Sequence, residues 1–180
     1  IDVSMLDCQI AILENAIARY LSKNEIPGPM GSRHPSIAPF EAFKTKDSYI
    51  IIAAGNDKLF TKLCDVLKIP ETANDERFNS NSLRCENMDH LKEIFEKQLS
   101  SKSTDEWVKE MEELKIPCGP IFNIKQAVEN PQIQERNMIV KSYHKIIGEF
   151  KSAGNPIKMS TYKDENTRGN IPDLDEHREK

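Results

Sequence analysis

The stretch GPMGSRHPSIAPFEAFKTKDSYIIIAAGND, residues 28–57, decides the fold expected for this chain. It begins with two glycines and two prolines within eight residues, GPMGSRHP, a pattern that neither a helix nor a central strand accommodates. Two β-rich segments follow, residues 40–44 and 49–54, separated by the polar turn TKDS. This arrangement predicts an antiparallel hairpin, and its partly uniform apolar character suggests burial on both faces. A stiff, basic loop is therefore expected to lead into a small sheet.

Helices are expected after the hairpin. Asn56 or Asp57 would cap a helix that runs to residue 67, and apolar spacing predicts a second helix over residues 82–99. Ser103 and Glu106 have the spacing of a capping box, which starts a third helix whose inner face carries Trp107. The order hairpin, helix, helix, helix indicates an α+β fold.

The pattern changes again at IPCGPI, residues 116–121, which we interpret as a bend from helix to strand. Helical spacing resumes over residues 123–137, with a turn or kink at Pro131, and a last hairpin is expected over residues 138–144 and 148–151.

The two ends of the sequence differ from this middle part. Apolar residues recur at helical spacing from Met5 to Tyr20, which predicts one long amphipathic helix that ends before Pro27. Beyond residue 156 the chain is charged and has too few apolar side chains for a packed element of its own. We therefore expect a linker helix at 1–27, a small α+β domain at 28–155 and an extended connector at 156–180. The absence of an initiator Met leads us to expect a piece of a longer protein.

Charge and hydropathy exclude several classes of partner. There are 25 Lys and Arg against 29 Asp and Glu, and the net charge of -4 gives no general attraction to nucleic acid or to an anionic membrane. Apolar runs such as YIIIAA are far shorter than the roughly 18 residues that span a bilayer, and the start lacks the basic region of a signal peptide. We expect a cytoplasmic protein that binds neither nucleic acid nor membrane.

Metal and redox sites are not expected. The cysteines at positions 8, 64, 85 and 118 form no C-x-x-C pair and have no histidine at a ligand spacing, so all four are interpreted as packing residues. The sequence also lacks a Gly-rich phosphate loop, an H-E-x-x-H motif and a G-x-S-x-G motif. One basic pair, Arg33 and His34, stands in the opening loop, where it would suit an anionic ligand. A stiff linker with a solvated Arg–His pair is the alternative.

Four segments together resemble a known family. They are HPSIAPFEAFKTKDSYIIIAAGNDKLFTKLCDVLKIPE, DERFNSNSLRCENMDHLKEIFE, EELKIPCGPIFNIKQAVENPQIQERNMIV and GNPIKMS, in this order. The chain resembles the class III coenzyme A-transferases, the CaiB/BaiF family, which includes formyl-CoA transferase. The match covers almost the whole sequence, and the segments are specific as a set.

The resemblance implies an architecture and a reaction. In this family the N- and C-terminal parts of a longer chain build a large Rossmann-like domain, the middle forms a small α+β domain, and two chains interlock as a homodimer. The reaction transfers CoA from an acyl-CoA donor to a carboxylic acid through an aspartyl-CoA intermediate. The substrates would be an acyl-CoA and a small carboxylic acid, with CoA thioester as substrate and no permanently bound cofactor.

The resemblance also bears on the site residues. The nucleophilic aspartate is expected upstream of this chain, so none of its residues, Asp2 and Asp7 included, is predicted to be catalytic, and the chain alone is expected to be inactive. The candidate substrate-binding residues are Gly31, Ser32, Arg33, His34, Asn56 and Asp57. The loop replaces a glycine run that closes over the intermediate in formyl-CoA transferase, and Arg33 and His34 would neutralise a substrate carboxylate instead.

Two alternatives stay open at this point. An α-methylacyl-CoA racemase has the same fold, and its acidic residue would fall near Asp57, although AAGND looks more like the transferases. The isolated chain could also be a non-catalytic dimerisation module.

Overall fold

The computed structural model describes residues 2–176 and residue 178. The chain forms two compact units, residues 1–120 and residues 121–180. This division differs from the boundaries expected at residues 27 and 155, which stay predictions about the organisation of the whole protein.

The first unit is built on a three-stranded antiparallel sheet in the order β1 (Phe40–Lys44), β2 (Tyr49–Ala53), β3 (Cys118–Pro120). The predicted hairpin is confirmed, with Ala42 paired to Ile51. The sheet is buried on one face, where Ile50 and Ile52 are inaccessible, whereas the opposite face is only half-buried, so the expectation of burial on both faces is wrong. Strand β3 lies within the bend interpreted at residues 116–121, although its three residues, Cys, Gly and Pro, carry no β-strand signal of their own.

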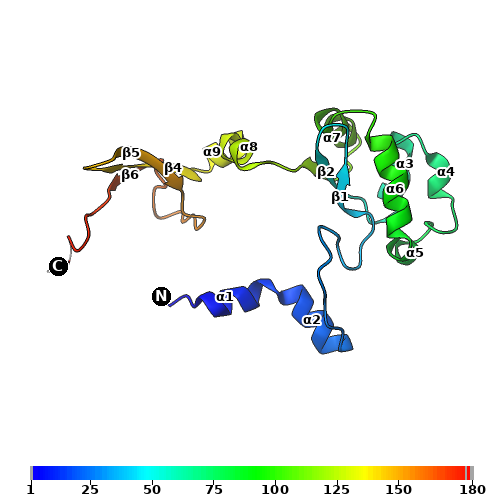
Figure 1. Cartoon of the computed structure of the whole chain (residues 1–180), viewed down its shortest axis with the longest axis horizontal. Coiled ribbons are helices and arrows are strands. Elements are labelled where there is room, and N and C mark those ends of the chain that lie inside the picture. The colour runs from blue at the N-terminus through cyan, green and yellow to red at the C-terminus, as the bar shows by residue number, and fades with distance from the viewer. Residues whose placement is uncertain (1, 177, 179–180) are drawn as a thin grey trace. The chain divides into compact units, whose positions relative to one another are not determined.

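Five helices complete the core of this unit: α3 (Asp57–Val66), α4 (Pro70–Ala73), α5 (Asn81–Glu86), α6 (Met88–Leu99) and α7 (Thr104–Glu113). Helix α6 packs against β1, and α7 packs against β2 and β3 (Figure 1). The interior is aromatic and aliphatic, and its members include Phe43, Phe60, Leu63, Phe78, Leu91, Phe95, Trp107 and Met111. The α+β class with a small antiparallel sheet and packed helices is therefore confirmed.

The helix expected over residues 82–99 is interrupted at Asn87. This residue has φ −107° and ψ 22°, and its side-chain amide donates to the carbonyl of Leu83 at 2.9 Å and to that of Arg77 at 3.3 Å. Asparagine side chains that bond to the backbone compete with regular helix. The result is two helices, α5 and α6, in place of one.

The N-terminal segment is also two helices, α1 (Met5–Ile12) and α2 (Glu14–Lys23) (Figure 1). The N–H of Leu13 donates to the carbonyl of Ile10 at 3.1 Å, so the last turn tightens to a spacing of three residues and the backbone leaves the α-helical region at Leu13. The prediction of one long helix is therefore wrong at this residue. Neither helix contains a buried residue, and Cys8 is exposed rather than packed, whereas Cys64 is buried in the core as expected.

The second unit holds α8 (Ile124–Glu129), α9 (Pro131–Glu135), β4 (Ile139–His144), β5 (Gly148–Ala153) and β6 (Thr167–Asn170). The predicted turn before Pro131 and the predicted hairpin are confirmed, the latter ending two residues later than expected. Strand β6 pairs with β4 in parallel, with Lys141 opposite Thr167. The expectation of no packed element beyond residue 156 is wrong here, because backbone hydrogen bonds to β4 hold a strand that has few apolar side chains.

No helix among the described residues is long and apolar enough to cross a membrane. In the same part of the chain, His, Cys, Asp and Glu side chains form no group of three that could hold a metal ion.

Candidate functional site

The loop at residues 28–35 is tied to the edge of the sheet. Gly31 has φ +65°, a conformation that glycine adopts without strain, in the turn that places the next residues beside β1. The hydroxyl of Ser32 accepts the N–H of Ala42 at 3.0 Å, and the N–H of His34 donates to the carbonyl of Phe40 at 2.9 Å. Since β1 is an edge strand, the loop supplies partners to backbone groups that the sheet leaves free. The sequence Gly31–His34 therefore has a fixed course along β1.

Arg33 is held between two carboxylates. Its Nε donates to Oε1 of Glu41 at 3.1 Å, and its Nη2 donates to Oδ1 of Asp89 on α6 at 2.5 Å. Glu41 is 3% exposed, and its second oxygen accepts from Nζ of Lys92. Two cations and two carboxylates thus face one hollow of about 640 Å³, which is also lined by Pro29, Met30, Gly31 and Ser32.

The two carboxylates that bind Arg33 differ in their exposure to solvent. The hydrogen bond from Arg33 lowers the pKa of Asp89, and the bond to Asp89 raises the pKa of Arg33. The Asp89 side chain is 90% exposed, whereas that of Glu41 is 4% exposed. Exposed ion pairs are weak because solvent screens them. A carboxylate from solution could therefore replace Asp89 at Arg33 while Glu41 stays in place.

His34 does not join Arg33 in this hollow. Its ring stacks on Phe40 with the centroids 5.2 Å apart and the planes 7° from parallel, and its Nδ1 accepts the N–H of Ser36 at 3.2 Å. A neutral imidazole with Nδ1 as acceptor carries its proton on Nε2. The two basic residues therefore have different neighbours: Arg33 contacts Glu41 and Asp89, and His34 contacts Phe40 and Ser36.

The turn at residues 55–57 borders a second, more apolar groove of about 450 Å³. Asn56 caps α3 as expected, since its Oδ1 accepts the N–H of Leu59 at 2.9 Å. The groove is lined by Ile37, Phe40, Ala53, Gly55, Asn56, Leu59 and Asn81. Phe40 links this groove to His34, because one side chain both lines the groove and stacks on His34.

Asp57 has a partner that sequence reasoning missed. Its Oδ1 accepts from Nη2 of Arg84 at 2.9 Å, and Arg84 is inaccessible to solvent. A signal was present, since Arg84 stands four residues before Met88 and seven before Leu91, on the buried stripe of the helical pattern. Glu41 was missed in the same way, although it precedes Phe43 by two residues and so shares its inward face of β1.

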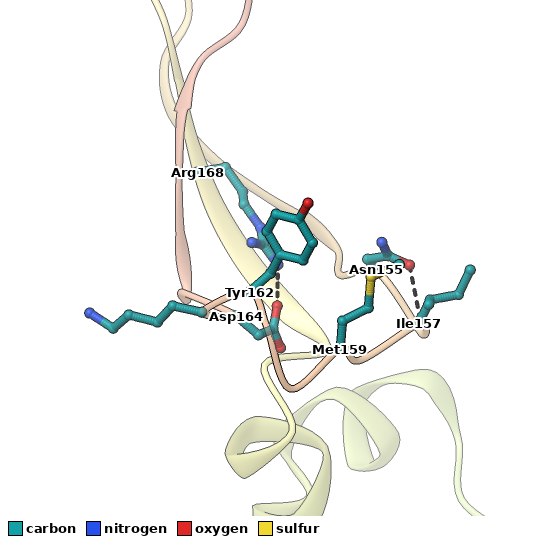
Figure 2. Close-up of a pocket in the computed structure, with 7 residues that line it drawn as sticks. Asn155, Ile157, Met159, Tyr162, Asp164 and Arg168 are labelled. Atoms are coloured by element: carbon teal, nitrogen blue, oxygen red, sulfur yellow. Dashed lines mark hydrogen bonds and ion pairs between the residues drawn. The ribbon is translucent and has the colours of Figure 1, made fainter.

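A third hollow, of about 350 Å³, lies in the second unit. Figure 2 shows Arg168 pointing toward Asp164, and the Nη2–Oδ1 distance is 2.7 Å. Lys158 contacts the same carboxylate, and hydrogen bonds from the two cations lower the pKa of Asp164. Two cations thus share the carboxylate of Asp164, and none of the predicted site residues lines this hollow.

Comparison with known proteins places these features in context. Residues 1–178 match the model of CoA-transferase family III. The chain is 40% identical over 176 residues to acetyl-CoA:oxalate CoA-transferase of Acetobacter aceti, covering 98% of this chain and 44% of that protein. It is 32% identical over 163 residues to human succinyl-CoA:glutarate CoA-transferase, covering 91% of this chain and 37% of that protein.

A solved structure agrees with these sequence matches. A CAIB/BAIF family protein from Brucella suis superposes with a TM-score of 0.78 at 33% identity, covering 98% of this chain and 45% of that chain. The chain thus spans less than half the length of the relatives it matches. With a family match over nearly every residue and a fold shared with a solved member, the chain belongs to CoA-transferase family III.

Proposed function

We propose that the whole protein transfers coenzyme A from an acyl-CoA donor to a small carboxylic acid. The observation that carries this proposal is the 40% identity to an acetyl-CoA:oxalate CoA-transferase over 98% of the chain. The relatives named for oxalate and for glutarate make short dicarboxylic acids the first acceptors to test. An acyl-CoA thioester would be a substrate, and no permanently bound cofactor is needed.

The proposed chemistry uses an aspartate outside this chain. Its carboxylate attacks the thioester carbonyl and releases CoA thiolate, which leaves a mixed anhydride. The thiolate then attacks the aspartyl carbonyl, so the donor acid leaves and an aspartyl-CoA thioester remains. The acceptor carboxylate reverses these steps and departs as the new acyl-CoA. Residues 1–180 alone are then expected to be inactive.

Within this chain, Arg33 is the proposed contact for the acid. It would exchange the exposed Asp89 for a substrate carboxylate while the buried Glu41 keeps the guanidinium oriented, and the difference in exposure of the two carboxylates supports this proposal. Gly31 and Ser32 would line the same hollow, Asn56 and Asp57 would lie at the neighbouring groove, and His34 would support Phe40 in that groove. A large Rossmann-like domain, an interlocked homodimer and a cytoplasmic location complete the proposal for the whole protein.

The test is an exchange assay on the whole protein with acetyl-CoA or succinyl-CoA as donor and oxalate or glutarate as acceptor. Loss of a charge-assisted contact costs about 1.5 kcal/mol or more, so Arg33→Ala should raise KM for the acid about tenfold, since ~1.4 kcal/mol is a factor of ten. Arg77→Ala is the matched control, because Arg77 is also paired with an aspartate, Asp75, but lines neither the hollow at Arg33 nor the apolar groove.

Three results would contradict parts of this proposal. No exchange with any donor and acceptor would reject the transferase function. Epimerisation of a 2-methylacyl-CoA without exchange would favour the racemase alternative near Asp57. Unchanged kinetics of Arg33→Ala for every acid would leave the loop as a linker only.

A further inference from the structure

The guanidinium of Arg84 binds three separate segments of the first unit. Its Nε donates to the carbonyl of Ala38 at 2.8 Å, and its Nη1 donates to that of Phe78 at 3.0 Å. Its Nη2 donates both to the carbonyl of Gly55 and to Oδ1 of Asp57, each at 2.9 Å. One buried side chain therefore connects the segment before β1, the turn before α3 and the segment before α5.

Two of these segments, together with the helix that carries Arg84, line the apolar groove. Ile37 comes from the first of them, Gly55 and Asn56 from the second, and Asn81 from the helix that carries Arg84. Asn81 adds two bonds of its own, as its Oδ1 accepts the N–H of Ala38 at 3.0 Å and its Nδ2 donates to the carbonyl of Ser36 at 2.8 Å. The shape of the groove thus depends on contacts made from α5.

The buried charge of Arg84 is balanced by one carboxylate, that of Asp57. An arginine stays protonated when buried, and three of its four acceptors are uncharged carbonyl groups. The single carboxylate, Asp57, has a side chain that is 74% exposed. The ring of Phe60 lies 4.5 Å from the guanidinium carbon and adds a cation–π contact. A buried charge costs desolvation energy that a well-packed apolar residue avoids, and here that charge orients a carboxylate that solvent or a ligand can reach.

We propose that Arg84 is a positioning residue of the substrate site. It fixes the turn Gly55–Asp57 and orients the exposed carboxylate of Asp57, which directly follows the groove residue Asn56. This inference rests on the proposed transferase function. Lysine cannot replace Arg84, because a single ammonium is a compact point charge and does not reproduce the planar fork that reaches these four acceptors.

The test compares Arg84→Lys, Asp57→Ala and the double variant in the whole protein, with Arg77→Lys as a matched control on an exposed Arg–Asp pair. Exchange kinetics are measured well below the unfolding temperature of each variant. We expect Arg84→Lys and Asp57→Ala each to raise KM for the acyl-CoA at least fivefold, because a carboxylate can accept the amide N–H groups of CoA. We expect kcat to stay within twofold, because the proposed nucleophile lies outside this chain. The KM of the double variant should be no higher than that of Arg84→Lys, and Arg77→Lys should have the KM and kcat of the wild type.

Several outcomes would overturn the inference. They are a KM within twofold of wild type in Arg84→Lys, an unchanged KM in Asp57→Ala, or effects of the two substitutions that multiply in the double variant. Asp57→Ala decides the question if Arg84→Lys does not fold, since this variant keeps the three carbonyl contacts of Arg84. A wild-type protein without exchange activity would reject the transferase function and this inference together, whereas active wild type with unaffected variants rejects the inference alone.

Discussion

Gly55 is the position where the groove leaves least room for a side chain. A Cβ added there would lie 2.0 Å from Cγ2 of Ile37 and 3.4 Å from its Cβ. Gly55 is not among the residues with positive φ, so alanine would meet no backbone strain. Any cost of Gly55→Ala therefore comes from the contact with Ile37.

The size of this cost follows from the surroundings of Ile37. Its side chain is 38% exposed and can turn toward solvent, but a β-branched side chain has few comfortable rotamers. An off-rotamer side chain costs about 0.5–1.5 kcal/mol, and overpacking a filled site costs about 1–3 kcal/mol. Replacing glycine by alanine lowers the conformational entropy of the unfolded chain, which stabilises the folded protein by about 0.4–1 kcal/mol. We expect Gly55→Ala to lower the free energy of unfolding by about 1 kcal/mol.

Denaturant unfolding of Gly55→Ala, Ile37→Ala and the double variant measures this directly. In the Ile37→Ala background the obstructing Cγ2 is gone, so alanine at position 55 should be neutral or stabilising by about 0.4–1 kcal/mol. Gly119→Ala is the control, because a Cβ at Gly119 would have no atom within 4 Å. Equal destabilisation by Gly55→Ala in both backgrounds would refute the steric explanation.

Two further predictions concern the core and a helix end. Burial raises the pKa of the Cys64 thiol to about 12, so it should not react with a thiol reagent in native protein at pH 8. In folded protein, Cys64→Ala should react with the reagent at the same number of thiols as the wild type, and in denaturant it should have one reactive thiol fewer. A smaller number of reactive thiols in the folded variant would contradict the burial of Cys64. Ser103→Ala should lower the free energy of unfolding by about 1 kcal/mol, because it removes the acceptor of the Glu106 N–H. Urea unfolding measures this change. Glu106→Gln keeps a residue that can complete the capping box, so it should lower the free energy of unfolding by less than Ser103→Ala. An equal decrease in the two variants would argue against the capping box.

Local patterns predicted the parts of the fold that local chemistry determines. The turn TKDS and its β-rich flanks specified the β1–β2 hairpin, and the spacing of Ser103 and Glu106 specified the start of α7. Strand β3 depends on pairing with β2 across a long stretch of sequence, and the break at Asn87 depends partly on the distant carbonyl of Arg77. Such contacts leave no periodic signal in the segment that makes them.

The candidate site shows the same limit. The sequence indicated that Arg33 carries a positive charge in a loop beside β1, but its carboxylate partner Asp89 is 56 positions away on α6. The buried position of Arg84 could be read from helical spacing, but its acceptors at Ala38 and Gly55 could not, because they are backbone atoms of other segments.

The pairing of charges in the hollow at Arg33 has a consequence for how a substrate arrives. Arg33 and Lys92 face Glu41 and Asp89, so the hollow has no excess charge of either sign to act on an ion at a distance. Long-range steering needs an unbalanced field and fades beyond about 10 Å at 0.1 M salt. Under the proposed function, an acid would therefore reach this region by ordinary diffusion. It would be selected only at contact, by whether its carboxylate fits the fork of Arg33 better than the side chain of Asp89 does.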